Sequence, residues 1–393
     1  MQYHHRQMEA TLTERLGQFP VVAVTGPRQS GKTTLVRHVL SDWSYVSLED
    51  FDQRMSATDD PRGFLRRWGP GTIIDEFQRA PKLVSYLQGI VDEEDRRGMY
   101  VLTGSQSYVL NEQLSQSLAG RVGLLTLHPF SYSELPDGYT GGGVWEVLLR
   151  GGFPRVAVGG VPPDVWYPSF VTTCMERDVR QMLAVKDLVQ FQVFMKLLAS
   201  RTGQLVNYAS LSRDCGISVP TVRQWLSVLE AGHLILRLPP WFSNHRKKLV
   251  KTPKIYFVDT GLLCHLLGIY GSEELSRHSA RGPVFENWIL CETIKSAAHR
   301  GLDSVLHFWR DKDGHEVDLI AAVRGRPAAI ECKSTETADP SHLRGLGYLR
   351  THTDIQATEL LAYAGDQTLS FGAAKAVPWC SLEQMLMEIW EGK

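Results

Sequence analysis

The chain has 393 residues, with 42 Lys and Arg against 43 Asp and Glu, and a formal net charge of −1. A length prior of roughly 100–200 residues per domain favours two or three domains, and we expect three. The balanced charge excludes a polycation, so any nucleic-acid contact has to come from local basic clusters. Hydrophobic residues make up 43% and charged residues 22%, which is typical of a folded globular protein.

Neither a metal-binding cysteine motif nor a membrane segment is visible in the sequence. The cysteines are scattered and form no C-x-x-C pair, which argues against a zinc site or a disulfide framework. The N-terminus has no apolar signal core, and no apolar run is long enough to span a bilayer. We therefore expect a soluble, cytoplasmic protein without membrane contact.

The first third of the chain alternates apolar runs with amphipathic stretches. An apolar strand at 21–24 leads directly into a glycine-containing loop and a helical segment. Further strands are expected at 45–48, 72–74, 99–102 and 124–127. This alternation predicts an α/β domain over residues 1–150 with a doubly wound parallel sheet.

The loop after the first strand matches the phosphate-binding pattern G-x-x-x-x-G-K-[ST]. Its residues are Gly26, Pro27, Arg28, Gln29, Ser30, Gly31, Lys32 and Thr33, and Thr34 follows. Backbone N–H groups and the helix N-terminus can cradle phosphates, while Lys32 reaches the β- and γ-phosphates. The Thr33 hydroxyl suits Mg²⁺, so ATP and Mg²⁺ are the predicted cofactors.

A second element of the site follows the strand at 72–74, which ends in Asp75 and Glu76. Asp75 is expected to hold Mg²⁺ directly or through water. Glu76 is expected to polarise the attacking water as general base. The alternative is a strand followed by a solvated acidic turn.

The strand around 99–102 ends in a polar tip, where ATPases of this architecture place a residue that contacts the γ-phosphate or the water. Ser105 is the predicted residue, with Thr103 and Gln106 as rivals. The alternative is an ordinary turn, because Ser and Gly favour turns.

Arg121 follows a small-residue turn and is the predicted arginine finger, acting across a subunit boundary on the transferring phosphoryl group. Arg155, Arg177 and Arg180 are alternative fingers. A plain surface arginine remains the other interpretation of Arg121.

Several runs together resemble a known family. They are Gly-Pro-Arg-Gln-Ser-Gly-Lys-Thr-Thr-Leu, Ile-Ile-Asp-Glu-Phe-Gln, Leu-Thr-Gly-Ser, Ala-Gly-Arg, His-Pro-Phe-Ser-Tyr-Ser-Glu-Leu and Lys-Ile-Tyr-Phe-Val-Asp-Thr-Gly-Leu. The chain resembles, over nearly its whole length, a prokaryotic family of AAA-type ATPases that carry a C-terminal domain of unknown function. The resemblance implies an AAA+-like engine, often assembled as a homo-oligomeric ring such as a hexamer. It specifies no substrate.

The middle of the chain is expected to be a helical lid or linker at 151–200 and a winged helix-turn-helix at 201–262. In the second helix, which begins near Ser218, the apolar residues Val222, Trp225, Leu226 and Leu229 should face inward. Thr221, Arg223 and Gln224 are then free for major-groove contact. A basic stripe for phosphates comprises 244–248, Lys251 and Lys254. The alternative is a winged helix that serves only as a lid or oligomerisation module.

The tail, 263–393, is expected to be an α/β domain with a helix at 284–298, strands at 304–309, Glu316–Val323 and 328–333, and helices after that. Asp318 and Glu331 could share a divalent metal, with Lys333 activating water and Glu286 as an additional acid. This order resembles the PD-(D/E)XK nuclease core. An inactive nuclease fold and a salt-bridged sheet remain alternatives.

These modules favour an ATP-hydrolysing, oligomeric motor that acts on DNA, branched or junction DNA included, by translocation, branch migration or metal-dependent cleavage. The rival from another class is an ATP-switched regulatory or defence-associated NTPase whose tail is an inactive scaffold. An ATPase that acts on proteins is the third hypothesis.

Overall fold

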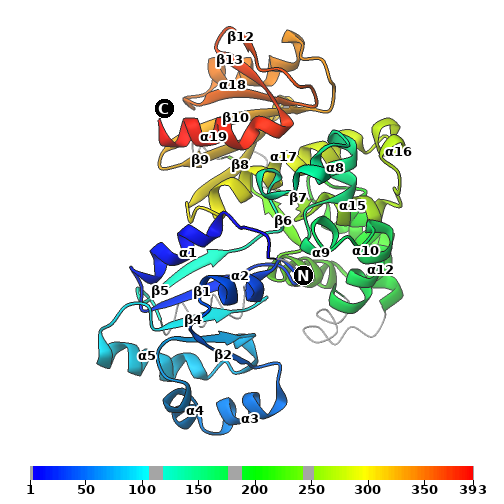
Figure 1. Ribbon diagram of the computed structural model, residues 1–393. Coiled ribbons are helices and arrows are strands. Elements are labelled where there is room, and N and C mark those ends of the chain that lie inside the picture. The colour runs from blue at the N-terminus through cyan, green and yellow to red at the C-terminus, as the bar shows by residue number, and fades with distance from the viewer. Residues whose placement is uncertain (1–2, 106–117, 176–187, 242–251, 393) are drawn as a thin grey trace. The chain divides into compact units, whose positions relative to one another are not determined.

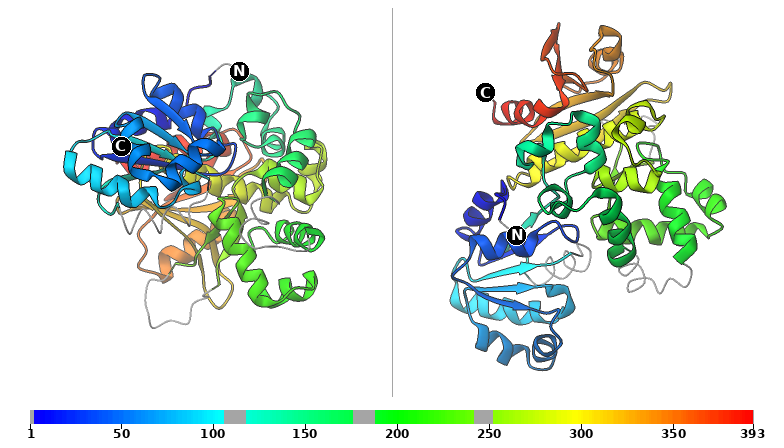
Figure 2. Two further views of the ribbon diagram at one scale, coloured as in Figure 1. Left: turned by 90° about the horizontal axis from the view of Figure 1, so that it is seen from below. Right: turned by 45° about the vertical axis from the view of Figure 1, so that its right-hand side comes forward.

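The computed structural model describes residues 3–105, 118–175, 188–241 and 252–392 (Figures 1 and 2). The chain forms two compact units. The N-terminal unit comprises 1–129 with the short segments 231–233 and 298–301, and the C-terminal unit comprises the remaining residues. The sequence predicts boundaries near 150, 200 and 262, whereas the structure groups the middle and the tail in one unit.

The N-terminal unit is built on a parallel sheet with the strand order β2-β3-β4-β1-β5. Its strands are β1 Val21–Thr25, β2 Ser44–Ser47, β3 Thr72–Asp75, β4 Tyr100–Thr103 and β5 Val122–Thr126. Its helices are α1 Met8–Leu16, α2 Lys32–Val39, α3 Phe51–Asp59, α4 Pro61–Trp68 and α5 Leu83–Glu94. The predicted parallel α/β sheet is confirmed.

Both faces of this sheet are covered, which explains its uninterrupted apolar strands. Along β1, Val21 and Ala23 pack in a core with residues of α4 and α5, whereas Val22 and Val24 pack in a second core with residues of α1 and α2. The blue and cyan part of Figure 1 shows these helices on opposite sides of the sheet. Side chains therefore cover both faces, and the polar loops collect at the strand ends.

The C-terminal unit contains a mixed sheet with the strand order β12-β13-β11-β10-β9-β8. The strands β8 Ser304–Arg310, β9 Glu316–Val323 and β10 Arg326–Lys333 are antiparallel neighbours, whereas β11 Thr358–Tyr363 and β13 Ala374–Pro378 run parallel to β10. One edge strand is β12 Leu369–Phe371 and the other is β8, and the helices around the sheet are α17 Arg281–Ala298, α18 Arg344–His352 and α19 Leu382–Glu391. The expectation of helices alone after residue 333 was wrong, because β11, β12 and β13 also follow.

The middle of the chain begins with a helix, a turn and a second helix: α13 Tyr208–Cys215, a left-handed Gly216, and α14 Val219–Ala231. The antiparallel pair β6 Ile235–Leu238 and β7 Lys254–Phe257 follows. On α14 the four predicted inward residues are buried, Arg223 and Gln224 are exposed, and Thr221 is half-buried. The predicted faces of this helix are confirmed.

Seven further α-helices lie in the described part of the C-terminal unit: α7 Asp137–Thr140, α8 Val144–Arg150, α9 Pro154–Ala157, α10 Pro163–Phe170, α12 Leu188–Ala199, α15 Thr260–Leu267 and α16 Ser272–Arg277. One continuous core includes Phe153 of this helical part, Trp225 of α14 and Ile330 of β10. The middle segment and the tail are therefore stabilised together.

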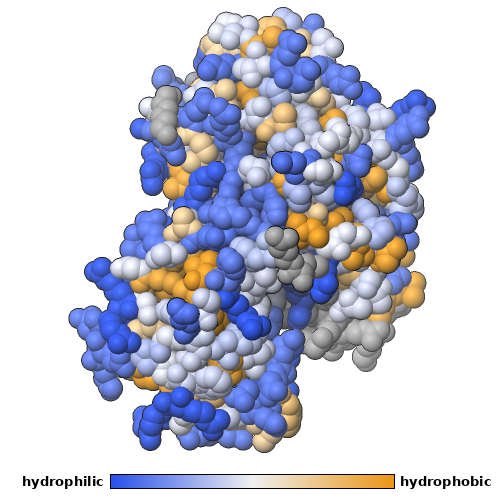
Figure 3. Space-filling model, in the orientation of Figure 1, coloured by the Kyte–Doolittle hydropathy of each residue, from blue (hydrophilic) through white to orange (hydrophobic). Residues whose placement is uncertain are grey.

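Hydrophilic side chains predominate on the face drawn in Figure 3, and the apolar ones form smaller patches. Within the described ranges, none of the helices combines the length and the apolar character that crossing a bilayer requires.

A buried ion pair fastens the segment after Pro129 to α17. The side chains of Glu292 and Lys295 are each 2% exposed, and their charged atoms lie 2.8 Å apart. Lys295 Nζ also donates to the Phe130 carbonyl at 2.9 Å, and the Tyr132 N–H donates to Glu292 at 2.7 Å. The two side chains therefore neutralise each other and also supply hydrogen-bond partners to the backbone groups of Phe130 and Tyr132.

We expect Lys295→Met to reduce the free energy of unfolding by about 3–5 kcal/mol, because it leaves the Glu292 carboxylate buried without a counter-charge. Chemical denaturation followed by tryptophan fluorescence measures this. The double variant E292M/K295M should recover much of the loss, since an apolar pair of similar volume needs no charge compensation. The exposed Lys312→Met is the control; equal effects of the two lysine substitutions would contradict the assignment.

Candidate functional site

The predicted phosphate-binding loop joins β1 to α2 at the carboxyl end of the parallel sheet. Gly26 has φ 138°, and a Cβ there would lie 2.2 Å from the Leu127 carbonyl oxygen, so a side chain is excluded. Gly31, with φ 97°, caps the N-terminus of α2. The loop thus directs the helix N-terminus and its backbone N–H groups toward one point, as phosphate binding requires.

Lys32 is buried in the curve of this loop. Its Nζ donates to the carbonyl oxygens of Gly26 at 3.0 Å and Pro27 at 2.8 Å. Of the other loop positions, Ser30 is buried, Arg28 is half-buried, and Gln29 and Thr34 are exposed. The ammonium group is therefore held where the loop would enclose a phosphate chain.

Asp75, at the end of β3, is the centre of the site. Its Oδ1 accepts hydrogen bonds from the Thr33 hydroxyl at 3.0 Å and from the Thr103 hydroxyl. Its Oδ2 accepts from the Tyr45 hydroxyl at 2.8 Å. The carboxylate connects the phosphate-binding loop with β2, β3 and β4.

Thr33 and Asp75 fit a magnesium ion. A hydroxyl and a carboxylate oxygen 3.0 Å apart supply hard oxygen donors on one side of a cation, and phosphate oxygens and water can supply the others. The three partners of Asp75 named above are neutral, so its negative charge is available to a cation. When bound, Mg²⁺ would offset negative charge on the β- and γ-phosphates.

Glu76 adopts a left-handed conformation, with φ 54°, directly after Asp75. Its Oε1 accepts from the Ser105 hydroxyl at 3.3 Å, and its Oε2 accepts from Gln78 Nε2 at 2.5 Å. Ser105 at the tip after β4 therefore lies beside the predicted base. Thr103 contacts Asp75 instead, and Gln106 lies outside the described residues.

Sequence reasoning missed Tyr45, whose position depends on tertiary structure. Its hydroxyl reaches Asp75 because β2 and β3 are parallel neighbours, with Ser47 opposite Asp75. Burial, followed by the hydrogen bond to Asp75 and its charge, raises the pKa of Tyr45 to about 12. The Arg37 guanidinium lies 4.6 Å from the ring centroid of Tyr45. No motif in the sequence signals this contact.

Arg6 is a second residue that the sequence did not indicate. Its side chain is buried, and its guanidinium donates to the Ser30 carbonyl at 2.9 Å and to the His128 carbonyl at 2.8 Å. These two hydrogen bonds connect the phosphate-binding loop to the segment that follows β5.

Arg121 lies immediately before β5, at the amino edge of the parallel sheet. Its Nε and Nη2 atoms donate to the two carboxylate oxygens of Asp92 on α5. The phosphate-binding loop follows β1 at the carboxyl edge, so Arg121 does not belong to the nucleotide site of its own sheet. Arg155 is exposed on α9, and Arg177 and Arg180 lie outside the described residues.

The C-terminal unit brings together the four residues predicted for the tail. Lys333 Nζ donates to Glu331 at 2.6 Å, and Asp318 Oδ2 accepts from the Cys332 N–H at 2.9 Å. Burial and then the nearby Asp318 charge raise the pKa of Glu286 to about 7 and that of Glu331 to about 8. Their role as metal ligands stays a prediction.

Lys254 also belongs to this cluster, and the expectation that it binds phosphate in a basic stripe was wrong. The side chain is 3% exposed and forms ion pairs with Glu286 and Glu316. The rest of the stripe, 244–248 and Lys251, lies outside the described residues.

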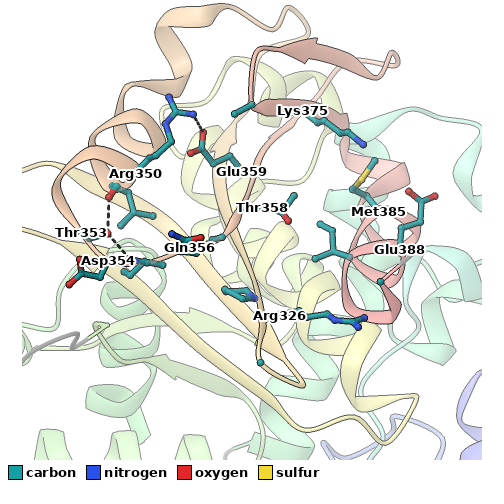
Figure 4. Close-up of a pocket in the computed structure, with 18 residues that line it drawn as sticks. Arg326, Arg350, Thr353, Asp354, Gln356, Thr358, Glu359, Lys375, Met385 and Glu388 are labelled. Atoms are coloured by element: carbon teal, nitrogen blue, oxygen red, sulfur yellow. Dashed lines mark hydrogen bonds and ion pairs between the residues drawn. The ribbon is translucent and has the colours of Figure 1, made fainter.

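A cavity of about 950 Å³ lies at the amino ends of β10 and β11 (Figure 4). Positively and negatively charged side chains line the cavity. Arg350 forms an ion pair with Glu359 at 3.2 Å, and Arg326 donates to the Trp390 carbonyl at 2.9 Å. Glu331 and Lys333 are at the carboxyl end of β10. The cavity is therefore separate from the acidic cluster and contains none of the predicted site residues.

We expect Tyr45→Phe to reduce Mg²⁺-dependent ATP hydrolysis about 10-fold or more, because removing the hydroxyl leaves Asp75 Oδ2 without this donor. Steady-state hydrolysis rates over a Mg²⁺ titration measure the effect. The control is Tyr86→Phe, at a partly exposed tyrosine on α5. Unchanged rates in Tyr45→Phe would show that the contact does not orient Asp75.

Family models match the chain in three consecutive parts. An AAA domain covers residues 18–136, a domain of unknown function (DUF8612) covers 142–273, and a second domain of unknown function (DUF4143) covers 281–382.

Among solved structures, a Walker-type ATPase of Pyrococcus abyssi is 17% identical, with a TM-score of 0.40 over 66% of this chain and 94% of that one. RuvB of Thermotoga maritima is also 17% identical, with a TM-score of 0.33 over 59% and 89%.

Curated relatives cover most of the sequence. Uncharacterized proteins of Mycobacterium tuberculosis and Mycobacterium bovis are each 33% identical over 371 residues, which is 93% of this chain and 81% of theirs. An uncharacterized protein of Haemophilus influenzae is 23% identical over 77% of this chain and 79% of its own. The chain belongs to the family of these mycobacterial proteins, with an N-terminal P-loop ATPase domain of the AAA type and a C-terminal DUF4143 domain.

Proposed function

We propose that this protein is an ATP-hydrolysing, oligomeric motor that acts on DNA. The observation that carries the hydrolytic part is the meeting of Thr33, Asp75, Glu76 and Ser105 at the carboxyl end of the parallel sheet. A binding site alone would need only the phosphate loop. A carboxylate next to the metal-binding pair supplies a base for water as well.

The residues of the site have separable roles in this proposal. Lys32 and the loop N–H groups hold the phosphates, and Thr33 and Asp75 hold Mg²⁺. Glu76 takes the proton of the attacking water, and the hydrogen bonds from Ser105 and Gln78 orient its carboxylate. Ser105 is close enough to Glu76 to contact the same water or the γ-phosphate.

Two features of the C-terminal unit support DNA as the substrate. The helix-turn-helix and the β6–β7 pair follow the winged-helix order, and Arg223 and Gln224 are exposed near the start of the second helix. In the tail, Glu286 on α17, Asp318 on β9 and the Glu331/Lys333 pair on β10 follow the order of a nuclease-like core. Branched DNA, such as a four-way junction, is the substrate that we would test first.

The position of Arg121 supports an oligomer. Arg121 lies at the amino edge of the sheet, whereas the phosphate loop of the same subunit lies at the carboxyl edge. Arg121 can therefore act as an arginine finger only on the nucleotide of a neighbouring subunit. Its ion pair with Asp92 holds the Arg121 side chain in a defined position. Both side chains are exposed enough for a neighbouring subunit to contact them.

A second candidate function is an ATP-switched regulatory NTPase whose tail is a catalytically inactive scaffold. The observation that favours it is the ion pairing of Lys254 with two acids of the tail. Action on protein substrates is the third possibility, and the same assay separates it.

We expect DNA to stimulate ATP hydrolysis, and Lys32→Ala to lower the rate about 100-fold or more by removing the cation at the phosphates. Rates are compared with single-stranded, duplex and four-way-junction DNA and with unfolded polypeptide. Arg223→Ala should reduce the stimulation while the basal rate stays unchanged, and the exposed Arg277→Ala is the control. Stimulation by polypeptide alone would identify a protein-directed ATPase, and no response to either would favour the regulatory function.

We expect Arg121→Ala to lower kcat about 1,000-fold. Mixing the Arg121→Ala and Lys32→Ala proteins should restore hydrolysis, since one subunit supplies the intact loop and its neighbour supplies the intact finger. Arg96→Ala, at an exposed arginine after α5, is the control. If the mixture stays as inactive as its components, Arg121 does not act across a subunit boundary.

A further inference from the structure

Lys254 is the most completely buried cation of the acidic cluster in the tail. It begins β7, whose backbone pairs with β6, and its side chain is 3% exposed. Burial of an ammonium group is unfavourable unless carboxylates and hydrogen bonds compensate for the lost hydration. The surroundings of Lys254 supply both.

Two carboxylates hold the ammonium group. Lys254 Nζ lies 3.0 Å from Glu286 Oε1 and 2.5 Å from Glu316 Oε1. The Tyr256 hydroxyl donates to the same oxygen of Glu286 at 2.5 Å, and Arg310 lies 3.0 Å from Glu316 Oε2. Glu286 Oε1 therefore already accepts two donors, and both oxygens of Glu316 are paired with cations.

The other half of the cluster is also engaged. Lys333 Nζ donates a hydrogen bond to Glu331 Oε1, and the Cys332 N–H donates to Asp318 Oδ2. Asp318 is close enough to Lys254, Glu286 and Glu331 to raise the pKa of each through its charge. Glu331 Oε2 is buried and has no hydrogen-bond partner. Three cations, Lys254, Arg310 and Lys333, thus face the four carboxyl groups of this cluster.

The predicted nuclease metal does not fit this arrangement. A divalent ion bound by Glu286 and Asp318 would lie close to the buried Lys254 ammonium, a charge of the same sign, and would compete with Lys254 and Tyr256 for the Glu286 carboxylate. In the described ranges, no group of three or more His, Cys, Asp or Glu side chains has an arrangement that could hold a metal ion. The residue types match a metal site, but their partners do not.

We propose that the Lys254 ammonium is the resident cation of the cluster formed by Glu286, Glu316, Asp318 and Glu331, and that it excludes a divalent metal ion. The tail then does not cleave phosphodiesters by metal catalysis, although it carries the acids that such a site would use. The inference does not depend on whether DNA is the substrate of the ATPase, because it concerns only the occupancy of this cluster.

The test measures Mn²⁺ binding to the nucleotide-free full-length protein by electron paramagnetic resonance of the unbound ion. The wild-type protein and Asp318→Asn should bind Mn²⁺ equally weakly. Lys254→Met keeps the alkyl volume and removes the charge, and it should bind Mn²⁺ at least about 10-fold more tightly than the wild type. Adding Asp318→Asn to Lys254→Met should abolish the gain.

Thermal unfolding supplies an independent measurement. Lys254→Met should melt at a lower temperature than the wild type, and Mn²⁺ should raise its Tm by more than it raises the wild-type Tm, because ligand binding to the native state stabilises it. The exposed Lys312→Met is the matched control and should respond like the wild type.

Two outcomes would overturn the proposal. One is Mn²⁺ binding by the wild-type protein that Asp318→Asn abolishes, a comparison that needs no Lys254 variant and so holds even if Lys254→Met fails to fold. The other is a folded Lys254→Met protein whose Mn²⁺ affinity is unchanged.

Discussion

The carboxylate of Asp75 is the contact on which the nucleotide site depends. Hydroxyl groups from the phosphate loop, from β2 and from β4 all donate to it, so a single side chain joins three segments that are distant in sequence. The parallel sheet makes this possible, because the carboxyl ends of neighbouring strands meet at one edge. Covering both faces of the sheet with helices leaves that edge for chemistry.

The two acidic sites of the chain differ in how their charge is compensated. Asp75 accepts hydrogen bonds from the neutral hydroxyls of Thr33, Tyr45 and Thr103, which orient it and leave its charge for a cation. Glu286 and Glu316 instead face the Lys254 ammonium, which already offsets their charge. Carboxylates of the same chemistry therefore favour magnesium in one unit and an internal ion pair in the other. The count of acids does not distinguish these cases; the identity of their donors does.

The compensated cluster belongs to the C-terminal unit, whose middle helices and mixed sheet share one core. A cluster whose charge is compensated by its own lysine can stabilise the fold of this unit. The continuous core shared by the middle helices and the mixed sheet makes the C-terminal unit a single compact unit.

Local sequence was sufficient for much of the structure. The strands β1 to β5 lie within a few residues of their predicted positions, and the buried face of α14 follows its apolar spacing. The strands β11 and β13 were missed, because short apolar runs do not by themselves distinguish a buried strand from a buried helix. The parallel pairing of β11 with β10 is a contact between distant segments, which a local pattern does not contain.

What the sequence by itself determined is the chemistry that adjacent residues carry: a glycine-containing loop with Lys32 and Thr33, and the acids Asp75 and Glu76 at a strand end. Only the tertiary structure decided which distant side chains meet them. Strand order and register brought Tyr45 to Asp75, and the packing of β7 against α17 and β9 brought Lys254 to Glu286 and Glu316. The physical reason is that a motif specifies donors and acceptors over a few residues, whereas charge compensation in a buried site is set by whichever partners the folded chain places within hydrogen-bonding distance.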